Sequence, residues 1–369
     1  MRDRSEIAAI KAGLQARIEE VCRRLLPHGR RDGPHWAAYN PFVAGDERKD
    51  PALKVGLKAD PGAWRDWRNG DKGDVIDLIA FANRTDRAGA LKWARDFLGL
   101  QSMSREERAK MERDARLAEK RRAEKAVKDR AFKLVEADRL FNRASRIGEG
   151  GAAERHARAY FKARGCALDD VPHLNPYSFR FSGASEWWKG AKWETADGRR
   201  FKSEAGPEFP AVHSAMRGAT GAVACCHVTF LDPIQPAKAP VTPPKLMFGE
   251  ALGTAIEVAC GPAAKPFWMA ETAAPLIIAE GIETALSLAI AIPEARVWAA
   301  GSLAGIGAAP VALDCVAAVT VARDNNFGND QAQAQLDRAL EALARTGKRV
   351  DVMASHVGDD FNDLMQGVD

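Results

Sequence analysis

Short apolar runs rich in β-branched residues dominate the last hundred residues of the chain, and two of them end abruptly in an acidic residue. The run from Leu276 to Ala279 leads into Glu280, and the run that begins at Val316 leads into Asp324. A helical pattern follows each run, an alternation typical of a parallel α/β sheet whose strands end at one common edge. We therefore expect the two acids to share that edge, where they suit a divalent metal, a phosphate group and hence nucleotide or nucleic-acid chemistry.

This C-terminal part is expected to contain four strands and two helices. The predicted strands are Leu276–Ala279, Arg296–Ala299, Val316–Val321 and Arg349–Met353, and the predicted helices are Ala285–Ile290 and Gln331–Ala344. Helices that alternate with strands in this way cover both faces of a parallel sheet.

The size and composition of the chain exclude several classes of protein. A length of 369 residues allows two or three domains with cores of their own. No apolar run reaches the roughly 20 residues that span a membrane, and the first residues lack the apolar segment of a signal peptide. The six cysteines are scattered and form no C-x-x-C pair. These features predict a cytoplasmic protein in a reducing compartment, with no membrane partner.

The net charge of +4 conceals two regions of opposite sign. Residues 273–369 contain six Lys or Arg and thirteen Asp or Glu, whereas the rest of the chain contains 48 basic and 37 acidic side chains. An acidic site beside a basic body is the balance expected of a protein that holds a polyanion and acts on it. A chance difference between domains would give the same composition.

Four units are expected along the chain. Residues 1–100 combine an opening helix that ends near Pro27 with short strands and a final helix. A charged helical linker (101–147), a small mixed α+β unit with strands at 222–231 and 254–259 (148–272) and the α/β unit (273–369) follow. The expected fold class is therefore α/β and α+β multidomain.

The linker is the most highly charged part of the chain. Between Gln101 and Ile147 it has fifteen basic and nine acidic residues, and it lacks Gly and Pro from Ser102 onward. Its basic residues could bind DNA, but a solvated helix face is the favoured interpretation of such a charge run. Further on, Val127, Ala131, Leu134, Val135 and Phe141 form an apolar stripe at helical spacing, which predicts that this half of the linker docks on another element.

Three motifs in the C-terminal unit resemble the Toprim domain, which bacterial-type primases, type IA and II topoisomerases and some nucleases share. They are residues 280–285 (EGIETA), 322–326 (ARDNN, with Gly328 close by) and 358–364 (GDDFNDL), in the family's order and at suitable spacing. The resemblance covers about residues 276–365 and is closest to the version found in phage and plasmid primase-like proteins. It implies a parallel sheet flanked by helices.

The resemblance also implies roles for individual residues. Glu280 would be the strand-end glutamate, acting as acid or base or as a metal ligand. Asp324 would be the first acid of the Asp-x-Asp pair that binds Mg²⁺ (or Mn²⁺). Asn326 stands at the second position of that pair and offers a carbonyl oxygen without a charge, so one metal site is expected to be weakened. The further candidate metal ligands are Asp360, Asp363 and Glu283.

A second resemblance concerns the first unit. Residues 62–79, which include the segment Gly-Asp-Val-Ile-Asp, resemble the end of the zinc ribbon that opens bacterial-type primases. The segment Trp64–Trp67 occupies the positions of the last two zinc cysteines, and His35–Pro41 the positions of the first ligands. A closed zinc site needs four ligands, which this region lacks. We therefore expect a degenerate ribbon without zinc, held together by aromatic side chains. The alternative is an ordinary helix start after a turn.

The middle unit faintly resembles the other half of a primase core. Residues 244–249 stand where the family has a Pro-Lys-Tyr-like segment, which makes Lys245 a candidate phosphate contact. His227, on the preceding strand, stands where a basic side chain is expected, and Arg323 is a third candidate nucleic-acid contact. The tryptophans at 187, 188 and 193 could stack on single-stranded bases, although clustered tryptophans are more often packing residues.

The order of the four units is that of a bacterial-type primase. The resemblance implies a phage- or plasmid-type DNA primase that joins ribonucleoside triphosphates on a single-stranded DNA template with Mg²⁺ or Mn²⁺. No G-x-x-x-x-G-K-[ST] motif is present, so a replicative helicase would be a separate partner. Two alternatives stay open: a weakened or inactive Toprim DNA-binding accessory protein, and a Toprim nuclease that uses the same acids with water as the nucleophile.

Overall fold

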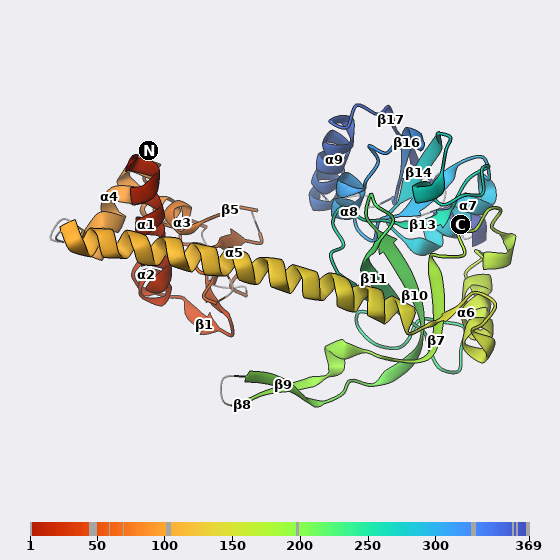
Figure 1. Ribbon diagram of the computed structural model, residues 1–369, viewed down its shortest axis with the longest axis horizontal. Coiled ribbons are helices and arrows are strands. Elements are labelled where there is room, and N and C mark those ends of the chain that lie inside the picture. The colour runs from red at the N-terminus through yellow and green to blue at the C-terminus, as the bar shows by residue number, and fades with distance from the viewer. Residues whose placement is uncertain are drawn as a thin grey trace. The chain divides into compact units, whose positions relative to one another are not determined.

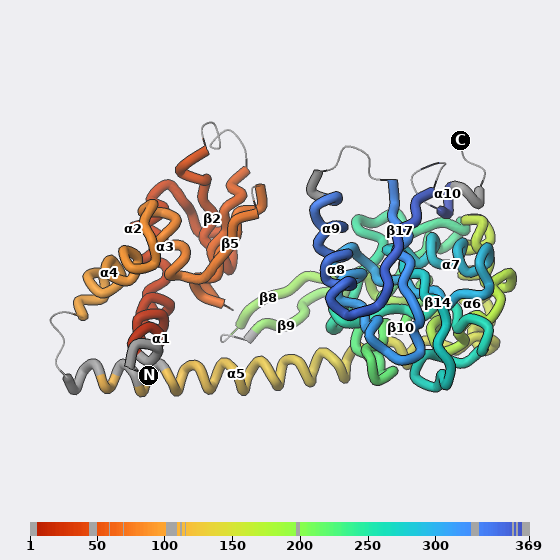
Figure 2. Tube along the Cα trace, turned by 90° about the horizontal axis from the view of Figure 1, so that it is seen from above, coloured from red at the N-terminus to blue at the C-terminus, as the bar shows by residue number. Residues whose placement is uncertain are grey.

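The computed structural model divides into two compact units, Met1–Val127 and Lys128–Asp369 (Figures 1 and 2). Helix α5 (Arg105–Asn142) crosses the division between them. The structure describes residues 2–43, 50–58, 60–68, 70–100, 105–196, 199–325, 330–355, 358 and 361–366.

The first unit is a small antiparallel sheet packed against helices. Helices α1 (Arg2–Ala16) and α2 (Ile18–Leu25) precede the sheet, and α3 (Val75–Asn83) and α4 (Arg87–Leu98) follow it. The five strands pair in sequence order: β1 (Arg30–Asp32), β2 (His35–Ala38), β3 (Leu53–Gly56), β4 (Trp64–Asp66) and β5 (Lys72–Gly73). The Gly-Asp-Val-Ile-Asp segment begins α3, where the side chains of Asp74 and Asp77 form a capping box.

The two segments that the resemblance aligns with zinc ligands are joined by a hydrogen bond. Asn40 Nδ2 donates to Asp66 Oδ2 over 2.8 Å, and both side chains are buried. Trp36 and Trp64 lie in the core beneath them. Cys22 also lies in that core, where burial raises the pKa of its thiol to about 12.

Among the described residues, the second unit contains two five-stranded sheets and a two-stranded hairpin, and the first five-stranded sheet (sheet B) is antiparallel. Its strand order is β12-β11-β10-β7-β6, and β10 and β11 run side by side through its centre. The strands are β6 (Ser145–Arg146), β7 (Phe179–Glu186), β10 (Glu208–Arg217), β11 (Val223–Phe230) and β12 (Lys245–Gly249). Helix α6 (Gly151–Ala163) packs on β7 and β10. A separate hairpin of β8 (Lys192–Ala196) and β9 (Arg199–Glu204) extends from this sheet.

The apolar side chains that α5 buries on sheet B lie in its last two turns, and Arg130, further back, forms an ion pair with Glu250. Phe141 is buried in a cluster with residues of β10 and β11, and Ala137 is buried as well. The expected docking stripe is thus confirmed at Phe141, and Leu134 is half-buried, whereas Val127 (68% exposed), Ala131 and Val135 lie on the surface. The spacing of the stripe is helical, but Ala131 and Val135 belong to a part of α5 whose apolar side chains are not buried against the sheet.

The second sheet of this unit (sheet C) is the predicted α/β layer. Its order is β13-β15-β14-β16-β17, with β14, β15, β16 and β17 mutually parallel and β13 antiparallel at one edge. The strands are β13 (Ile256–Ala259), β14 (Ala274–Ala279), β15 (Arg296–Ala299), β16 (Val316–Arg323) and β17 (Val350–Ala354). The helices are α7 (Ile282–Ala291), α8 (Leu303–Ala308), α9 (Asp330–Ala344) and α10 (Phe361–Gln366).

Both faces of sheet C are covered, as predicted. Ile277 faces a core shared with α7, α6 and sheet B, whereas its neighbours Leu276 and Ile278 face a core shared with α8 and α9. This alternation follows from the two-residue repeat of a strand. Because helices and a second sheet bury both faces, the strand can be apolar throughout, and that uniform run is the signal visible in the sequence.

The antiparallel edge strand β13 is tied to its neighbour by a buried ion pair. Glu257 on β13 meets Arg296 on β15 at 2.7 Å, and both side chains are fully buried. Glu257 also accepts hydrogen bonds from Asn175 Nδ2 and from the backbone N–H of Phe267. Sheet C therefore includes a strand that lies ahead of residue 273, where the α/β unit was expected to begin.

Candidate active site at the carboxyl edge of sheet C

Glu280 and Asp324 lie at the same edge of sheet C, directly after the neighbouring strands β14 and β16. Ala279 pairs with Ala322, so Glu280 is level with Arg323 and Asp324 lies one residue further along. Both acidic side chains are half-buried. The prediction that the two strand-end acids share one edge is confirmed.

Glu280 is held where its protonation can change easily. Its backbone carbonyl accepts a hydrogen bond from Gly301 N–H over 2.9 Å, which fixes the strand end against the loop after β15. Burial raises the pKa of its carboxyl, and the nearby Lys245 ammonium opposes that rise. A carboxyl with a raised pKa in a partly open site is suited to give or take a proton.

Glu283, in the first turn of α7, is the centre of a buried cluster of polar groups. Tyr160 Oη donates to its Oε1 over 2.6 Å. Lys238 Nζ lies 2.9 Å from Oε1, and Lys245 Nζ lies 2.9 Å from Oε2. Burial alone would raise the pKa of Glu283, but Lys245, Lys238 and Tyr160 hold it well below its usual value. The carboxylate that the sequence suggests as a metal ligand therefore has both oxygens engaged by protein donors.

The two lysines of this cluster leave positive charge beside Glu280. Lys238 and Lys245 share one carboxylate, and their side chains are 33% and 31% exposed. Lys245 begins β12, and Lys238 pairs with Leu231 in the loop ahead of it. Two ammonium groups against one carboxylate can attract a phosphate without leaving Glu283 unpaired.

Tyr160 and Lys238 are the residues of this cluster whose roles the sequence does not reveal. Tyr160 lies on α6, 123 positions before its hydrogen-bond partner Glu283, inside an apolar pattern that predicts packing. Lys238 lies in a Pro-rich loop that could equally be solvated. Neither position carries a local signal, because the contact forms only when sheet B packs on sheet C.

His227 does not suit the role of a charged nucleic-acid contact. It lies on β11, between β10 and β12, and is only 5% exposed. Burial and the nearby Lys245 lower its pKa to about 4, so the ring is uncharged at neutral pH. The side chain of His227 is buried because β11 is an interior strand. It pairs with β10 on one side and with β12 on the other, and the residues from Cys225 to Phe230 are all buried.

The remaining candidates lie around the ends of β16 and β17. Asn325 Nδ2 donates to the carbonyls of Ser355 and Gly358, joining the two strand ends. Asp363 is half-buried on α10, next to Asn362, whose side chain donates to Arg164 O and Ser287 Oγ. Arg323 ends β16 and is half-buried. The predicted ligands Asn326 and Asp360 lie outside the described residues.

The described side chains fit a divalent cation at Glu280 and Asp324. Both offer carboxylate oxygens at adjacent strand ends, and oxygen donors are those that Mg²⁺ and Mn²⁺ take. Within the described ranges, no group of three or more His, Cys, Asp or Glu side chains gathers around one point. Two carboxylates suit a cation that also binds water and substrate phosphate.

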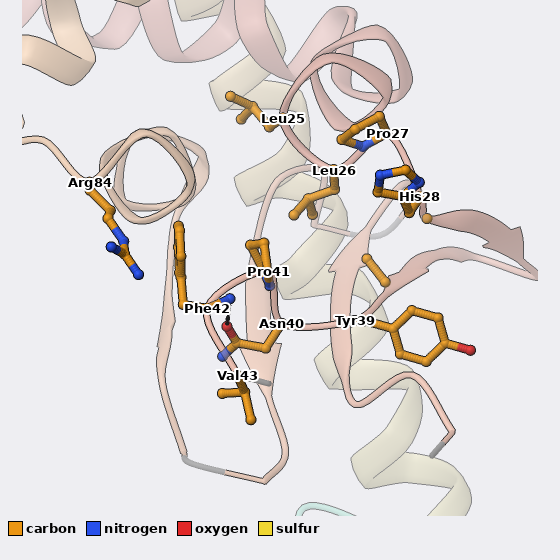
Figure 3. Close-up of a pocket in the computed structure, with 12 residues that line it drawn as sticks. Leu25, Leu26, Pro27, His28, Tyr39, Asn40, Pro41, Phe42, Val43 and Arg84 are labelled. Atoms are coloured by element: carbon orange, nitrogen blue, oxygen red, sulfur yellow. Dashed lines mark hydrogen bonds between the residues drawn. The ribbon is translucent and has the colours of Figure 1, made fainter. Parts of the chain in front are cut away.

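The first unit contains a pocket of about 720 Å³ of quite different character (Figure 3). The guanidinium of Arg84 lies 4.1 Å from the centre of the Phe42 ring at its rim. The wall is mostly apolar and includes Leu25, Leu26, Pro27, His28, Gly29, Ala38, Tyr39, Asn40, Pro41, Phe42, Val43 and Arg84. Among the described residues that line it, none is acidic.

Comparison with known families agrees with this geometry. Residues 275–368 match the Toprim domain, so the chain carries a Toprim domain that includes β14 to β17 and both strand-end acids. Residues 111–258 match a domain of unknown function (DUF7146), which runs from α5 through sheet B into β13. No curated protein sequence is similar enough to count as a match. The class is thus that of Toprim-domain proteins.

Several solved primase structures resemble the chain at low identity. The Aquifex aeolicus primase (zinc-binding and RNA polymerase domains) is 14% identical with a TM-score of 0.37, over 95% of this chain and 80% of that one. A DnaG primase catalytic domain bound to ssDNA is 16% identical with a TM-score of 0.38, over 64% and 76%. The primase fragment of the bacteriophage T7 primase-helicase is 11% identical with a TM-score of 0.28, over 49% and 64%.

One further property follows from the helices. In the described parts of the chain, no helix is both long and apolar enough to cross a membrane.

Proposed function

We propose that this Toprim-domain protein is a DNA primase-like nucleotidyltransferase that joins ribonucleotides on single-stranded DNA with the help of a divalent metal. One observation carries the proposal: the strand-end acids Glu280 and Asp324 share one edge of sheet C, and Lys245, near Glu280, belongs to a lysine pair that shares the single carboxylate of Glu283. The carboxylates can bind a divalent cation and transfer a proton, whereas the ammonium groups can bind the negatively charged triphosphate.

The proposed reaction divides the work among few side chains. The 3′ oxygen of one nucleotide attacks the α-phosphorus of the next, the α–β phosphate bond breaks, and pyrophosphate leaves. Glu280 takes the proton of the attacking hydroxyl, a task for which its raised pKa is suited. Lys245 and Lys238 hold the triphosphate. Bound at Glu280 and Asp324, Mg²⁺ or Mn²⁺ would neutralise the phosphate charge.

The proposal names three partners. They are the single-stranded DNA template, ribonucleoside triphosphates and, since the chain has no P-loop motif, a separate replicative helicase. Arg323, at the end of β16 next to Asp324, is proposed as a further phosphate contact at this edge. The phage or plasmid setting rests on the motif resemblance.

A second candidate function is favoured by one residue in the sequence. Asn326 stands at the second position of the Asp-x-Asp pair, where an acid would contribute charge to a metal site. A protein with this substitution could bind single-stranded DNA as an accessory factor without catalysis. Asn326→Asp separates the two: tighter metal binding and faster synthesis would indicate a weakened enzyme, and no change would indicate a binding protein.

The decisive test is primer synthesis on mixed-sequence single-stranded DNA with labelled ribonucleotides and Mg²⁺ or Mn²⁺. We expect short labelled products from the unaltered protein and at least about a hundredfold less from Glu280→Gln, because a positioned acid or base contributes on that scale. Glu294→Gln is the matched control, since Glu294 is an exposed glutamate of the same domain.

Other outcomes would assign the protein differently. Absence of product, together with DNA binding that Glu280→Gln leaves intact, would favour the accessory protein. Shortening of the DNA that depends on Glu280 would favour a nuclease, in which water replaces the 3′ oxygen as the nucleophile.

A further inference from the structure

Sheet B carries an extended hairpin that its core does not require. Strands β7 and β10 pair as far as Glu186 and Glu208, and the chain between them continues outward as β8 and β9 (Figure 1). All five residues of β8 are exposed. Because the hairpin buries so little apolar surface, hydrophobic burial does not account for its length. We call residues 192–204 the arm.

The base of the arm is anchored on the body of the unit. Trp187 donates its ring N–H to the carbonyl of Pro243 over 3.0 Å, and Trp188 packs edge-on against Phe230. Gly206 lies so close to Trp187 that a Cβ there would stand 2.2 Å from the Trp187 carbonyl oxygen. These tryptophans are packing residues, and they hold the start of the arm in one conformation.

The outer part of the arm has one face that combines an aromatic ring with cations. The pairing of β8 with β9 sets Trp193 opposite Lys202 and Thr195 opposite Arg200, so these four side chains share a face. The Arg200 guanidinium lies 4.7 Å and the Lys202 ammonium 5.8 Å from the centre of the Trp193 ring system. The indole is nevertheless 45% exposed.

The opposite face of the same arm presents a different aromatic ring. It presents Phe201, paired with Glu194, and Phe201 is as exposed as Trp193, at 46%. Lys192 pairs with Glu204, and Lys202, on the face of Trp193, also pairs with Glu186 at the base of the arm. Among the described residues, Arg200 meets no carboxylate within salt-bridge distance.

We propose that the face of Trp193, Arg200 and Lys202 binds single-stranded nucleic acid, with a base stacked on the indole and the backbone phosphates near the cations. An exposed ring flanked by cations is the arrangement that binds single strands without reading their sequence. An acidic protein would use the cations but has less need of the open indole. Because binding requires neither metal nor nucleotides, the proposal does not depend on the catalytic function.

The test measures the dissociation constant of the full chain for a fluorescein-labelled mixed-sequence single-stranded DNA, without metal or nucleotides. Loss of one base stack corresponds to roughly 5- to 160-fold weaker binding, and we expect this of Trp193→Ala. Arg200→Ala should also weaken binding and lower the slope of log Kd against log salt by about 0.7, the value for one phosphate contact. Phe201→Ala, on the opposite face, is the matched control and should stay within about twofold of the unaltered protein.

Three results would overturn the proposal. One is unchanged affinity in both Trp193→Ala and Arg200→Ala while the unfolding temperature stays normal. Another is an equal loss in Phe201→Ala, which would mean that the faces do not differ. The third is a loss in Arg200→Ala alone, equal for DNA and for polyglutamate, which would indicate a site for acidic proteins. Because this binding assay contains neither metal nor nucleotides, absent primer synthesis would leave the arm proposal intact.

Discussion

Glu283→Gln is the substitution that most directly tests the cluster beside the candidate active site. The glutamine keeps the size of the side chain but removes the charge that faces Tyr160, Lys238 and Lys245. The amide oxygen of the glutamine can still accept a hydrogen bond. Its NH₂ group can only donate, and it would face groups that are themselves donors. The two ammonium groups are then left without their counter-ion.

The expected loss of stability can be worked out from the contacts. A buried hydrogen bond to a charged acceptor, such as that of Tyr160, contributes about 1.5–3 kcal/mol. The lysine side chains are about a third exposed, so solvent screening limits each ion pair to roughly 0.5 kcal/mol. We expect Glu283→Gln to cost about 2–4 kcal/mol, or roughly 4–16 °C in the unfolding temperature of a unit this size.

Urea and thermal unfolding at pH 7 measure this loss, with Glu341→Gln as the control. Glu341 pairs with Arg345 on the surface of α9, so its replacement should change stability by less than about 0.5 kcal/mol. Equal stability of the two variants would refute the assignment of Glu283 as the centre of the cluster.

The pH dependence gives a second check on the same residue. Because the folded-state pKa of Glu283 is lowered, its stabilising effect is complete above the unfolded pKa of about 4.3 and is lost as the pH falls through the folded value. The stability gap between the unaltered protein and Glu283→Gln should be constant from pH 8 to about pH 5.5 and should narrow below about pH 4.3. A gap that widens in acid would contradict this reasoning.

Three further predictions concern other parts of the chain. His213 and His227 have pKa values lowered by burial to about 4, so the unfolded chain takes up protons first; stability should fall by about 3 kcal/mol per histidine between pH 7 and pH 4, measured by urea unfolding. Asp66→Ala removes two buried hydrogen bonds and should cost the first unit about 1–3 kcal/mol, whereas EDTA should leave its unfolding unchanged. Gly206→Ala introduces a clash of 2.2 Å with a backbone oxygen and should loosen the arm, seen as faster limited proteolysis between residues 187 and 206.

Each of these predictions has a contradicting result. A stability that is flat from pH 7 to pH 4, and unaltered by His227→Gln, would mean that the histidine is not buried in its neutral form. Sensitivity of the first unit to EDTA would point to a bound metal. A Gly206→Ala arm as resistant as the original would show that the close contact with Trp187 is easily relaxed.

The architecture of sheet C could be predicted because its signal is local. Residues 276–279 are buried on both faces of the sheet, so the whole strand is apolar and stands out from its polar neighbours. The abrupt change to Glu280 marks the strand end, and the same change marks Asp324. Because the carboxyl ends of adjacent parallel strands lie at the same edge of a sheet, the nearness of the two acids follows from the topology alone.

The parts that could not be predicted depend on contacts between distant segments. Nothing near Glu283 indicates that Tyr160 donates to it, and nothing near Lys245 shows that its ammonium is already paired. His227 was expected to reach nucleic acid because of its position on a strand, but β11 is central and has no open side. The docking stripe of α5 has correct helical spacing, yet of its members only Phe141 is buried and only Leu134 is half-buried.

The first unit illustrates the same limit on a smaller scale. Aromatic residues could be predicted to fill the ribbon-like core, and Trp36 and Trp64 do lie there. The hydrogen bond between Asn40 and Asp66 was not predicted, because two polar residues 26 positions apart carry no pairing signal until the strands align.

The antiparallel strand β13 has a consequence for how this protein can be divided or recombined. The segment that matches the Toprim family begins at residue 275, after β13 has already been completed. Excising that segment would leave β15 paired with β14 on one side only, expose the backbone groups that β13 now pairs, and leave Arg296 without Glu257. In this chain the segment that matches the Toprim family is therefore expected not to fold without β13. A fragment designed to fold by itself must include Ile256–Ala259, and so must a segment exchanged between relatives.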